Sequence, residues 1–407
     1  MDERLAGLIG ARVCAIRVAK HQTRVVVAGL SGITTDYLYQ IERGRKLPAI
    51  PMVIQLARVL GVPVSRLLEG PEAAASERPG GTDVGMVLYR ALTQSVVPDE
   101  SDEPPPVAEL GERVRSAWRI WQSSPYRYSE LARQLPVLIT DTELAEQRYQ
   151  REGERSERRQ VQCCAVDLYG LLRTVTKRVG RVDLSLLVAD RAIRAAEAAS
   201  DPHRLAAAQW NLAHVLLADH EPEGAEAVAV RAAETIAPLV QAGDGDAMAL
   251  CGGLRLLGAL ASVRQGQVWA ARERVRAVVE LAERTRERNA YWTAFGPTNV
   301  AMYAVSVEVE AGEAAEALRL AEQVDPDRSP SIERRVAFLI EQAKGYTQRR
   351  DYASALVLLQ RVSREAPEDM AHRPAAHQLL RTVIHRGRRG VAAEAAQLAD
   401  RFALPIS

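Results

Sequence analysis

The chain has 407 residues, of which 47% are hydrophobic, and its formal net charge at pH 7 is +1. This length exceeds the usual size of one domain, so we expect at least two folding units with buried cores. No apolar run in the sequence reaches the length of a membrane span, and the acidic start MDERL lacks the charge pattern of a signal peptide. These two observations favour a cytoplasmic protein with no membrane partner.

The first seventy residues have the pattern of five short helices. Thr23 can cap a second helix over RVVVAGL that ends at Gly32, and Thr34 can cap a third helix that runs to about Arg43. Two further helices are expected over IPMVIQLARVLG and VSRLLEG. Two short helices joined by a few residues that include glycine form a helix-turn-helix, so residues 1–70 are expected to be a DNA-binding domain.

This region is also the basic part of the chain. Residues 1–70 carry ten Arg and Lys against five Asp and Glu, a net charge of +5, which leaves −4 for the remainder. A modest basic surface is compatible with a polyanionic partner such as double-stranded DNA, although the charge alone is weak evidence for one.

The third helix has one apolar face and one polar face. Leu38 and Ile41 are expected to pack inward, and the outward set is rich in groups that can bond to base edges: Thr35, Asp36, Tyr39, Gln40 and Arg43. A recognition helix enters the major groove by its N-terminal end, while nearby cations contact phosphates. The phosphate candidates are Arg24, Arg43, Arg45 and Lys46. The alternative interpretation is a polar helix face that is only solvated.

Three segments across residues 9–68 resemble the xenobiotic-response-element (XRE) and phage-repressor family of helix-turn-helix domains. They are IGARVCAIRVAKHQT, VAGLSGITTDYLYQIERGRKLP and VIQLARVLGVPVSRLL. The resemblance implies a lambda-repressor-like fold in which Thr34 caps the recognition helix, Thr35, Asp36 and Gln40 face bases, and Arg43 and Arg45 approach the DNA backbone. It also implies a structural ion pair between Arg17 and Glu42. Valines at positions 25 and 26 depart from the polar residues usual in that family and suggest a protein contact there.

Residues 71–106 have the composition of a linker. PEAAASERPGG and PDESDEPPP flank a short apolar piece, VGMVLYRALTQSVV. We expect two flexible connectors around one small helix.

From residue 107 to 407 the sequence is patterned as helices almost throughout. Small residues recur at Ala225, Ala270, Ala314 and Ala355, which are 45, 44 and 41 positions apart. In the best copies a proline follows the second helix, at Pro326 and Pro367, as in tetratricopeptide (TPR) repeats. The expected fold is therefore all-α: a helix-turn-helix domain followed by a TPR-like α-solenoid.

Stacked helical hairpins form a concave surface, which can bind a peptide, a partner protein or a second subunit. A homodimer whose repeats sense a ligand is one hypothesis. The alternative is a scaffold whose repeats recruit a partner protein, with DNA binding secondary to that role.

An aromatic run at residues 289–305, NAYWTAFGPTNVAMYAV, stands out within the repeats. It concentrates Tyr291, Trp292 and Phe295 and places Pro297 where it should kink or restart a helix. These aromatic rings either capture a ligand or fill the junction of two repeats. Together with WRIWQSSPYRYSELARQLPVLI, the run resembles actinobacterial XRE regulators with TPR-like C-terminal halves.

A second resemblance concerns the ligand. Helix-turn-helix proteins with TPR-like repeats resemble the peptide-pheromone receptors of Gram-positive bacteria, in which amide side chains on first helices hold a peptide. This resemblance implies ligand-binding roles for Asn211 and Asn299, which lie early in first helices next to Trp210 and Thr298. The other candidate ligand-binding residues are Tyr291, Trp292 and Phe295 of the aromatic run.

The common catalytic and metal-binding motifs are missing. The sequence has no GxxxxGK[ST], HExxH, GxSxG or paired CxxC motif. The spacing of His372, His377 and His385 does not place neighbouring imidazoles on one helix face. We therefore expect no enzyme activity, no cofactor and no metal site.

Overall fold

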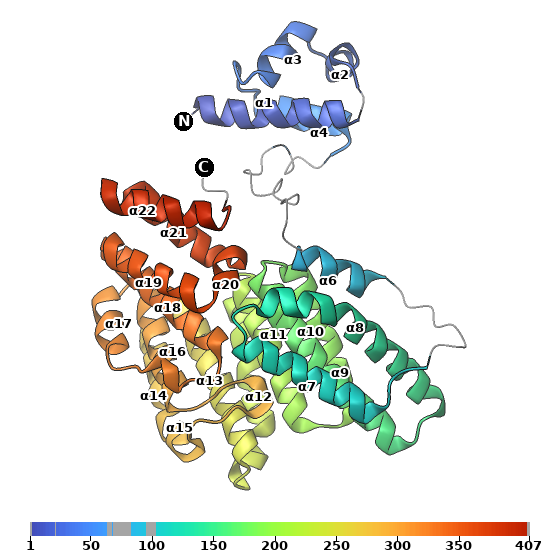
Figure 1. Ribbon diagram of the computed structural model, residues 1–407, viewed down its shortest axis with the longest axis vertical. Coiled ribbons are helices and arrows are strands. Elements are labelled where there is room, and N and C mark those ends of the chain that lie inside the picture. The colour runs from blue at the N-terminus through green and yellow to red at the C-terminus, as the bar shows by residue number, and fades with distance from the viewer. Residues whose placement is uncertain (1, 21, 63–66, 68–82, 95–102, 405–407) are drawn as a thin grey trace. The chain divides into compact units, whose positions relative to one another are not determined.

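The computed structural model describes residues 2–20, 22–62, 67, 83–94 and 103–404. Contacts divide the chain into two compact units, Met1–Gly81 and Thr82–Ile406. Within the described residues every named element is a helix, and the only strand-like feature is one isolated antiparallel bridge between Arg288 and Phe295 (Figure 1). The expectation of an all-α protein is confirmed.

The N-terminal unit contains helices α1 (Asp2–Ala19), α2 (Arg24–Ser31), α3 (Thr35–Glu42) and α4 (Ile50–Leu60). The expected caps are present, because the Thr23 side chain accepts a hydrogen bond from the Val26 amide and the Thr34 side chain accepts one from the Tyr37 amide. The helices share one core: Ile9, Val13, Val27, Ala28, Leu38, Ile41, Val53, Leu56, Ala57, Leu60 and Leu67. Leu67 is the one described residue of the expected fifth helix, which otherwise lies outside the described residues.

Helix α1 lies very close to the end of α3, and glycines permit this approach. A Cβ atom on Gly10 would lie 2.0 Å from the carbonyl oxygen of Ile41, and one on Gly44 would lie 2.7 Å from the Cα of Gly7. Gly44 also has a left-handed backbone (φ +69°), which favours glycine. These contacts fix the position of α3 on the rest of the unit.

Helix α6 (Val84–Thr93) is the small helix expected within residues 71–106. It packs against α8 (Arg127–Glu152), and its residues Val84, Leu88 and Leu92 belong to the core of the C-terminal unit. These residues recur every four positions, so they form one apolar stripe that is stable only when it is covered. The two expected connectors fall largely outside the described residues.

The C-terminal unit continues as antiparallel helices stacked one after another, a TPR-like α-solenoid (Figure 1). After α8 the helices are α9 (Arg155–Arg178), α10 (Val182–Ala199), α11 (Pro202–Ala218), α12 (Pro222–Gln241), α13 (Gly245–Arg264), α14 (Val268–Arg276), α15 (Val279–Thr285), α16 (Pro297–Glu310), α17 (Ala314–Ala321), α18 (Ile332–Gln348), α19 (Tyr352–Glu365), α20 (Pro367–His372), α21 (Pro374–Arg386) and α22 (Arg389–Arg401). Helix α7 (Val107–Ser123) precedes them, and the short turns η2 (Ala290–Trp292) and η3 (Pro326–Arg328) interrupt them.

The small residues expected in second helices lie in α12, α14, α17 and α19. Ala225, Ala314 and Ala355 are buried, whereas Ala270 is half-buried and the next residue, Ala271, is fully buried in its place. The register expected for that repeat was therefore wrong by one residue, because the apolar spacing alone does not distinguish two adjacent alanines. Pro367 begins α20 and Pro326 begins η3, so both follow the end of a second helix as expected.

Helix α13 is apolar and central. It is the one helix among the described residues that is long and apolar enough to cross a membrane, and 83% of its apolar window is buried inside the protein. Its neighbours are α11, α12, α14, α15 and α16. Helix α13 is therefore the core helix of the repeats.

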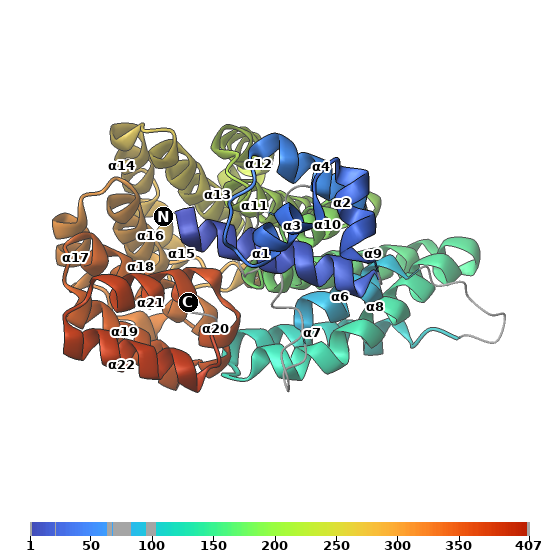
Figure 2. The same ribbon diagram turned by 90° about the horizontal axis from the view of Figure 1, so that it is seen from above.

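The first and last parts of the C-terminal unit are joined by buried charges, and α20 approaches the start of α8 (Figure 2). Arg127 at the start of α8 pairs with Asp369 on α20, and both side chains are fully buried. Glu368 accepts a hydrogen bond of 2.7 Å from the Tyr128 amide. Glu333 on α18 pairs with Arg178 at the end of α9 and lies 3.5 Å from Arg373. These pairs join the early helices α8 and α9 to the late helices α18 and α20.

Candidate functional site

The N-terminal half of α3 presents a polar surface. Thr34, Thr35 and Asp36 are exposed, whereas Leu38 and Ile41 on the opposite face are fully buried. The Gln40 amide donates a hydrogen bond of 2.7 Å to the Asp36 carboxylate, one turn earlier on the same face. Gln40 is thus oriented along the exposed face, with its second amide hydrogen and its carbonyl oxygen available to a base edge.

Glu42 ties α3 to the two helices before it. Its buried carboxylate lies 2.6 Å from the Arg17 guanidinium on α1 and 2.6 Å from the Arg24 guanidinium on α2. Burial acts to raise the pKa of Glu42, but the hydrogen bonds from Arg17 and Arg24 outweigh it and lower that pKa below its usual value. The ion pair expected between Arg17 and Glu42 is confirmed.

The cations near α3 fall into two groups. Arg24, expected to contact phosphate, is held by Glu42, although its side chain stays 41% exposed. Arg43, Arg45 and Lys46 are exposed just after α3. The half-buried Tyr39 ring lies between Arg24 and Arg43, 5.3 and 5.6 Å from their guanidinium carbons. Tyr39 thus connects one cation on α2 with one at the end of α3.

Residues 8–69 match a family model described as a helix-turn-helix domain. This part of the chain is a helix-turn-helix domain. Helices α2 and α3 of the domain are joined by the left-handed Gly32 (φ +71°), which is the turn that the motif requires. No curated protein matches the sequence.

Solved structures resemble the chain only distantly. PlcR of Bacillus thuringiensis, crystallised with the peptide PapR7 and DNA, is 11% identical, with 86% of this chain and 99% of that chain covered and a TM-score of 0.31. The apo competence regulator ComR of Streptococcus vestibularis is 11% identical, with 86% and 99% covered and a TM-score of 0.29. Yeast Tom70 is 12% identical, with 97% and 84% covered and a TM-score of 0.35. At these scores the likeness assigns no ligand or partner to this chain.

Helix α2 of the helix-turn-helix domain carries an apolar surface. Val25, Val26 and Leu30 are 68%, 47% and 61% exposed. Val25 and Val26 are thus apolar and exposed at the two positions where polar residues were expected from the XRE pattern.

The aromatic run forms a loop with an unusual backbone. Arg286, Tyr291, Trp292 and Ala294 all have left-handed φ angles between 47° and 65°, and the amide of Arg288 bonds to the carbonyl oxygen of Phe295 at 2.9 Å. Such non-glycine residues each carry about 1–3 kcal/mol of strain and cluster at functional sites. Helix α16 then restarts at Pro297, as predicted.

The five residues predicted to bind a ligand are not gathered in one place. Trp292 stacks on Trp118 with ring centroids 5.1 Å apart, whereas Tyr291 stacks on His203 at 5.8 Å. Phe295 is fully buried, and its ring fills the space that a side chain at position 252 would need, which is occupied by glycine. Phe295 therefore fills the junction between repeats.

The two asparagines expected to clamp a peptide are both buried. The Asn211 carbonyl oxygen accepts a hydrogen bond from Arg173, and Asn299 is 5% exposed. The Asn299 oxygen has no hydrogen-bond partner within the described residues.

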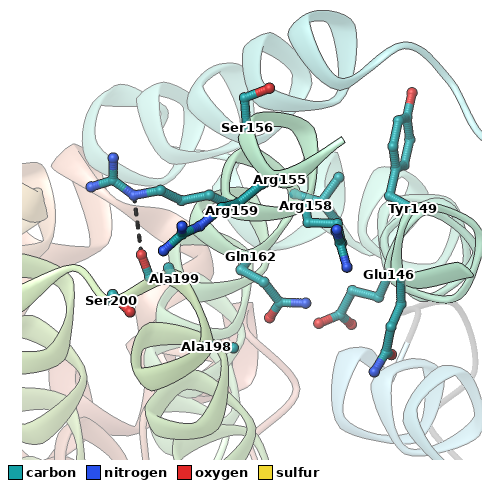
Figure 3. Close-up of a pocket in the computed structure, with 12 residues that line it drawn as sticks. Glu146, Tyr149, Arg155, Ser156, Arg158, Arg159, Gln162, Ala198, Ala199 and Ser200 are labelled. Atoms are coloured by element: carbon teal, nitrogen blue, oxygen red, sulfur yellow. Dashed lines mark hydrogen bonds between the residues drawn. The ribbon is translucent and has the colours of Figure 1, made fainter. Parts of the chain in front are cut away.

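Sequence reasoning missed a hollow of about 870 Å³ formed by α8, α9 and the end of α10 (Figure 3). The Arg159 guanidinium donates to the Ala199 carbonyl oxygen at 3.1 Å, and burial raises the pKa of Glu146, which accepts a hydrogen bond from Tyr169. The arginine-rich run RSERRQ was the available signal. A single carboxyl group among solvated arginines and alanines selects no particular ligand chemistry.

The described ranges hold no group of three or more His, Cys, Asp or Glu residues placed to bind a metal ion.

Proposed function

We propose that the protein is a sequence-specific DNA-binding transcriptional regulator of the XRE type, in which α3 reads bases in the major groove. The observation that carries this proposal is the exposed polar face of α3 inside a helix-turn-helix domain, with cations at the end of the helix. Thr35, Asp36 and Gln40 are proposed to read base edges, Thr34 to cap the helix, and Tyr39 to hold its neighbouring arginines against the DNA.

Phosphate contacts are proposed for the exposed residues Arg43, Arg45 and Lys46. Arg24 is proposed to contact a phosphate while it also binds Glu42. Because Arg24 binds the Glu42 carboxylate, its guanidinium reaches a phosphate only as one member of that bridge.

The repeats are proposed to bring two subunits together and to respond to a ligand, so that two helix-turn-helix domains bind the two halves of a roughly two-fold operator. The proposed domains are residues 1–70 and residues 107–407, with α6 (Val84–Thr93) added to the second because it packs there. The protein is proposed to act in the cytoplasm by binding DNA, without catalysing a reaction.

A second candidate function is an interaction scaffold that recruits a partner protein, and the exposed apolar surface on α2 favours it. The two functions are distinguished by the isolated fragment of residues 1–75. A regulator requires this fragment to shift DNA at low salt, because phosphate contacts strengthen as salt falls. A scaffold requires no DNA binding by the fragment and predicts a partner captured by the full chain.

The direct test of the proposed function is binding of the full chain to DNA upstream of its own gene, measured by footprinting. A protected site with two related halves is expected. Binding that is indifferent to sequence contradicts the proposal.

A further inference from the structure

A small cavity inside the C-terminal unit collects basic and aromatic side chains from helices far apart in the sequence. Its volume is about 30 Å³, enough for one small chemical group. Four of the five tryptophans line it: Trp118, Trp121, Trp210 and Trp292. The other lining residues come from α7, α9, α11 and the start of α18, and they are Gln122, Arg173, Thr174, Lys177, Arg178, His214, Ser331, Glu333 and Arg334.

The charges around this cavity do not balance. Its lining holds four basic side chains, Arg173, Lys177, Arg178 and Arg334, and one carboxylate, Glu333. That carboxylate is already bound by Arg178 and lies near Arg373. Buried positive charges that lack an opposite charge are unfavourable, so this excess favours an anionic group in the cavity.

Three hydrogen-bond donors at the cavity also lack an acceptor. The Nε atoms of Arg173 and Arg178 and the indole Nε1 of Trp210 are buried and have no hydrogen-bond partner within the described residues. Buried donors are paired in the great majority of cases, and unpaired ones require an explanation. The N–H groups of arginine and tryptophan are donors that a carboxylate or a phosphate can satisfy.

The aromatic loop forms one wall of this cavity. Trp292, in the strained segment, lies flat on Trp118, with an angle of 6° between the rings. Asn289 donates a hydrogen bond of 2.7 Å to Gln122, another lining residue. The loop thus contributes Trp292 to the lining and holds a second lining residue, Gln122, through Asn289.

The lining of the cavity includes residues that are partly exposed. Lys177, His214, Trp292 and Arg334 each remain partly exposed, whereas Arg173 is buried beneath them. Burial and the neighbouring charge of Arg178 lower the pKa of Arg173 to about 9, and burial also lowers the pKa of Lys177 well below its usual value. A bound anion would favour the protonated form of both residues.

We propose that this cavity is a binding site for the oxyanion group of a ligand, either a carboxylate or a phosphate, held by Arg173, Arg178 and Trp210 beneath the Trp118–Trp292 pair. The site would give the repeats the ligand that the proposed function requires, and an effect of that ligand on DNA binding depends on the proposed function. The binding itself is measured without DNA.

The experiment uses the full chain with Trp269→Phe, because Trp269 is 70% exposed and is the one tryptophan outside the cavity lining. Tryptophan fluorescence then reports only on the cavity. Inorganic phosphate and benzoate are titrated at constant ionic strength, with chloride as the reference anion, and thermal unfolding is followed at each concentration. Ligand that binds only the folded state raises the midpoint of unfolding.

Two variants test the assigned donors, and one controls for charge. Arg173→Gln removes a lining cation, and Trp210→Phe keeps the aromatic ring but removes the N–H group. Each is expected to weaken anion binding about tenfold or more. Arg255→Gln, an exposed arginine on α13 outside the lining, is expected to leave binding unchanged.

A peptide pair distinguishes the two sources of the oxyanion. If the ligand is the C-terminus of a peptide, a short peptide with a free carboxylate binds more tightly than phosphate or benzoate, and its C-terminal amide does not bind. If the ligand is a small molecule, phosphate or benzoate binds at least as tightly as the free-acid peptide. Saturable binding of the acid and the amide with equal affinity would mean that the oxyanion is not recognised and would overturn the proposal.

The proposal is also overturned if neither phosphate, benzoate nor the peptide acid gives saturable binding beyond chloride, or if Arg173→Gln and Trp210→Phe, folded by circular dichroism, bind as tightly as their parent. DNA affinity is measured separately without anion. Loss of DNA binding alone would refute the proposed function and leave the cavity site standing.

Discussion

At the scale of single residues, α3 has one set of residues that anchor it in the domain core and another set that face outward. Glu42 and Leu38 are buried and fix the helix, whereas Thr35, Asp36 and Gln40 point away from the core. The hydrogen bond between Gln40 and Asp36 holds the amide in place, so the base contact proposed for Gln40 would lose less entropy on binding.

Gln40→Ala is therefore expected to weaken binding to the preferred site by about 1–3 kcal/mol and to leave binding to random DNA nearly unchanged, because a lost base contact affects only the matching base. The measurement is a mobility shift with both DNAs at one salt concentration. An equal loss on both DNAs would mean that Gln40 contacts the backbone.

Arg45→Ala is expected to weaken binding to both DNAs alike and to reduce the slope of log affinity against log salt by about one, because it removes one phosphate contact. A salt titration of the wild type and the variant measures this slope. A loss confined to the preferred site would instead assign Arg45 to base recognition.

At the scale of elements, the helix-turn-helix domain depends on the close contact of α1 with the end of α3. Gly10→Ala would place a methyl group 2.0 Å from a backbone carbonyl oxygen, which cannot move without moving α3. We expect the variant to lose the thermal transition of the N-terminal unit and DNA binding, while the C-terminal unit still unfolds at its usual temperature.

The matched control is Gly29→Ala on α2. A Cβ atom there meets nothing within 4 Å. Because alanine favours a helix over glycine, this variant should be more stable by about 0.5–1 kcal/mol. If Gly10→Ala is as stable as Gly29→Ala, the described packing of α1 on α3 is wrong.

The elements that sequence reasoning predicted well are those with local signals. The caps at Thr23 and Thr34 and the restart at Pro297 each depend on a few adjacent residues, and all three are confirmed. The packing of α6 was missed because the composition of its flanks resembles a linker, although its apolar stripe was visible. The register at Ala270 failed because two adjacent alanines are equivalent in the pattern.

The cavity and the ion pairs between early and late helices could not be predicted, since they join distant positions. Arg127 and Asp369 are 242 positions apart, and Arg178 and Glu333 are 155 apart. No periodicity links such residues. The aromatic run did point to Trp292, but Arg173 and Trp210 gave no signal of their own because cationic and aromatic residues are common in helices.

At the scale of the whole C-terminal unit, Glu333 connects the early and late helices. Burial acts to raise its pKa, but the positive charges of Arg178 and Arg373 outweigh it and hold the pKa well below its usual value of 4.5. The charged form is therefore favoured in the folded state. Its contribution to stability is present above about pH 4.5 and is lost as the pH falls below that value.

Glu333→Gln should accordingly destabilise the C-terminal unit by about 3–5 kcal/mol at pH 7, because it leaves guanidinium groups uncompensated. The difference from wild type should shrink between pH 4.5 and pH 3, where the wild type itself loses the contribution. Denaturant unfolding across this pH range measures it. Glu273→Gln, in a surface pair with both side chains 63% exposed, should change little at any pH.

The most direct test of the central claim is selection of DNA bound by the full chain from a random library, followed by sequencing, with wild type and Gln40→Ala compared. We predict a recurring motif with two related half-sites spaced by about one or more helical turns, and an altered base preference within each half-site for the variant. No enriched sequence with the wild-type protein, or the same motif with both proteins at equal strength, would contradict base reading by α3.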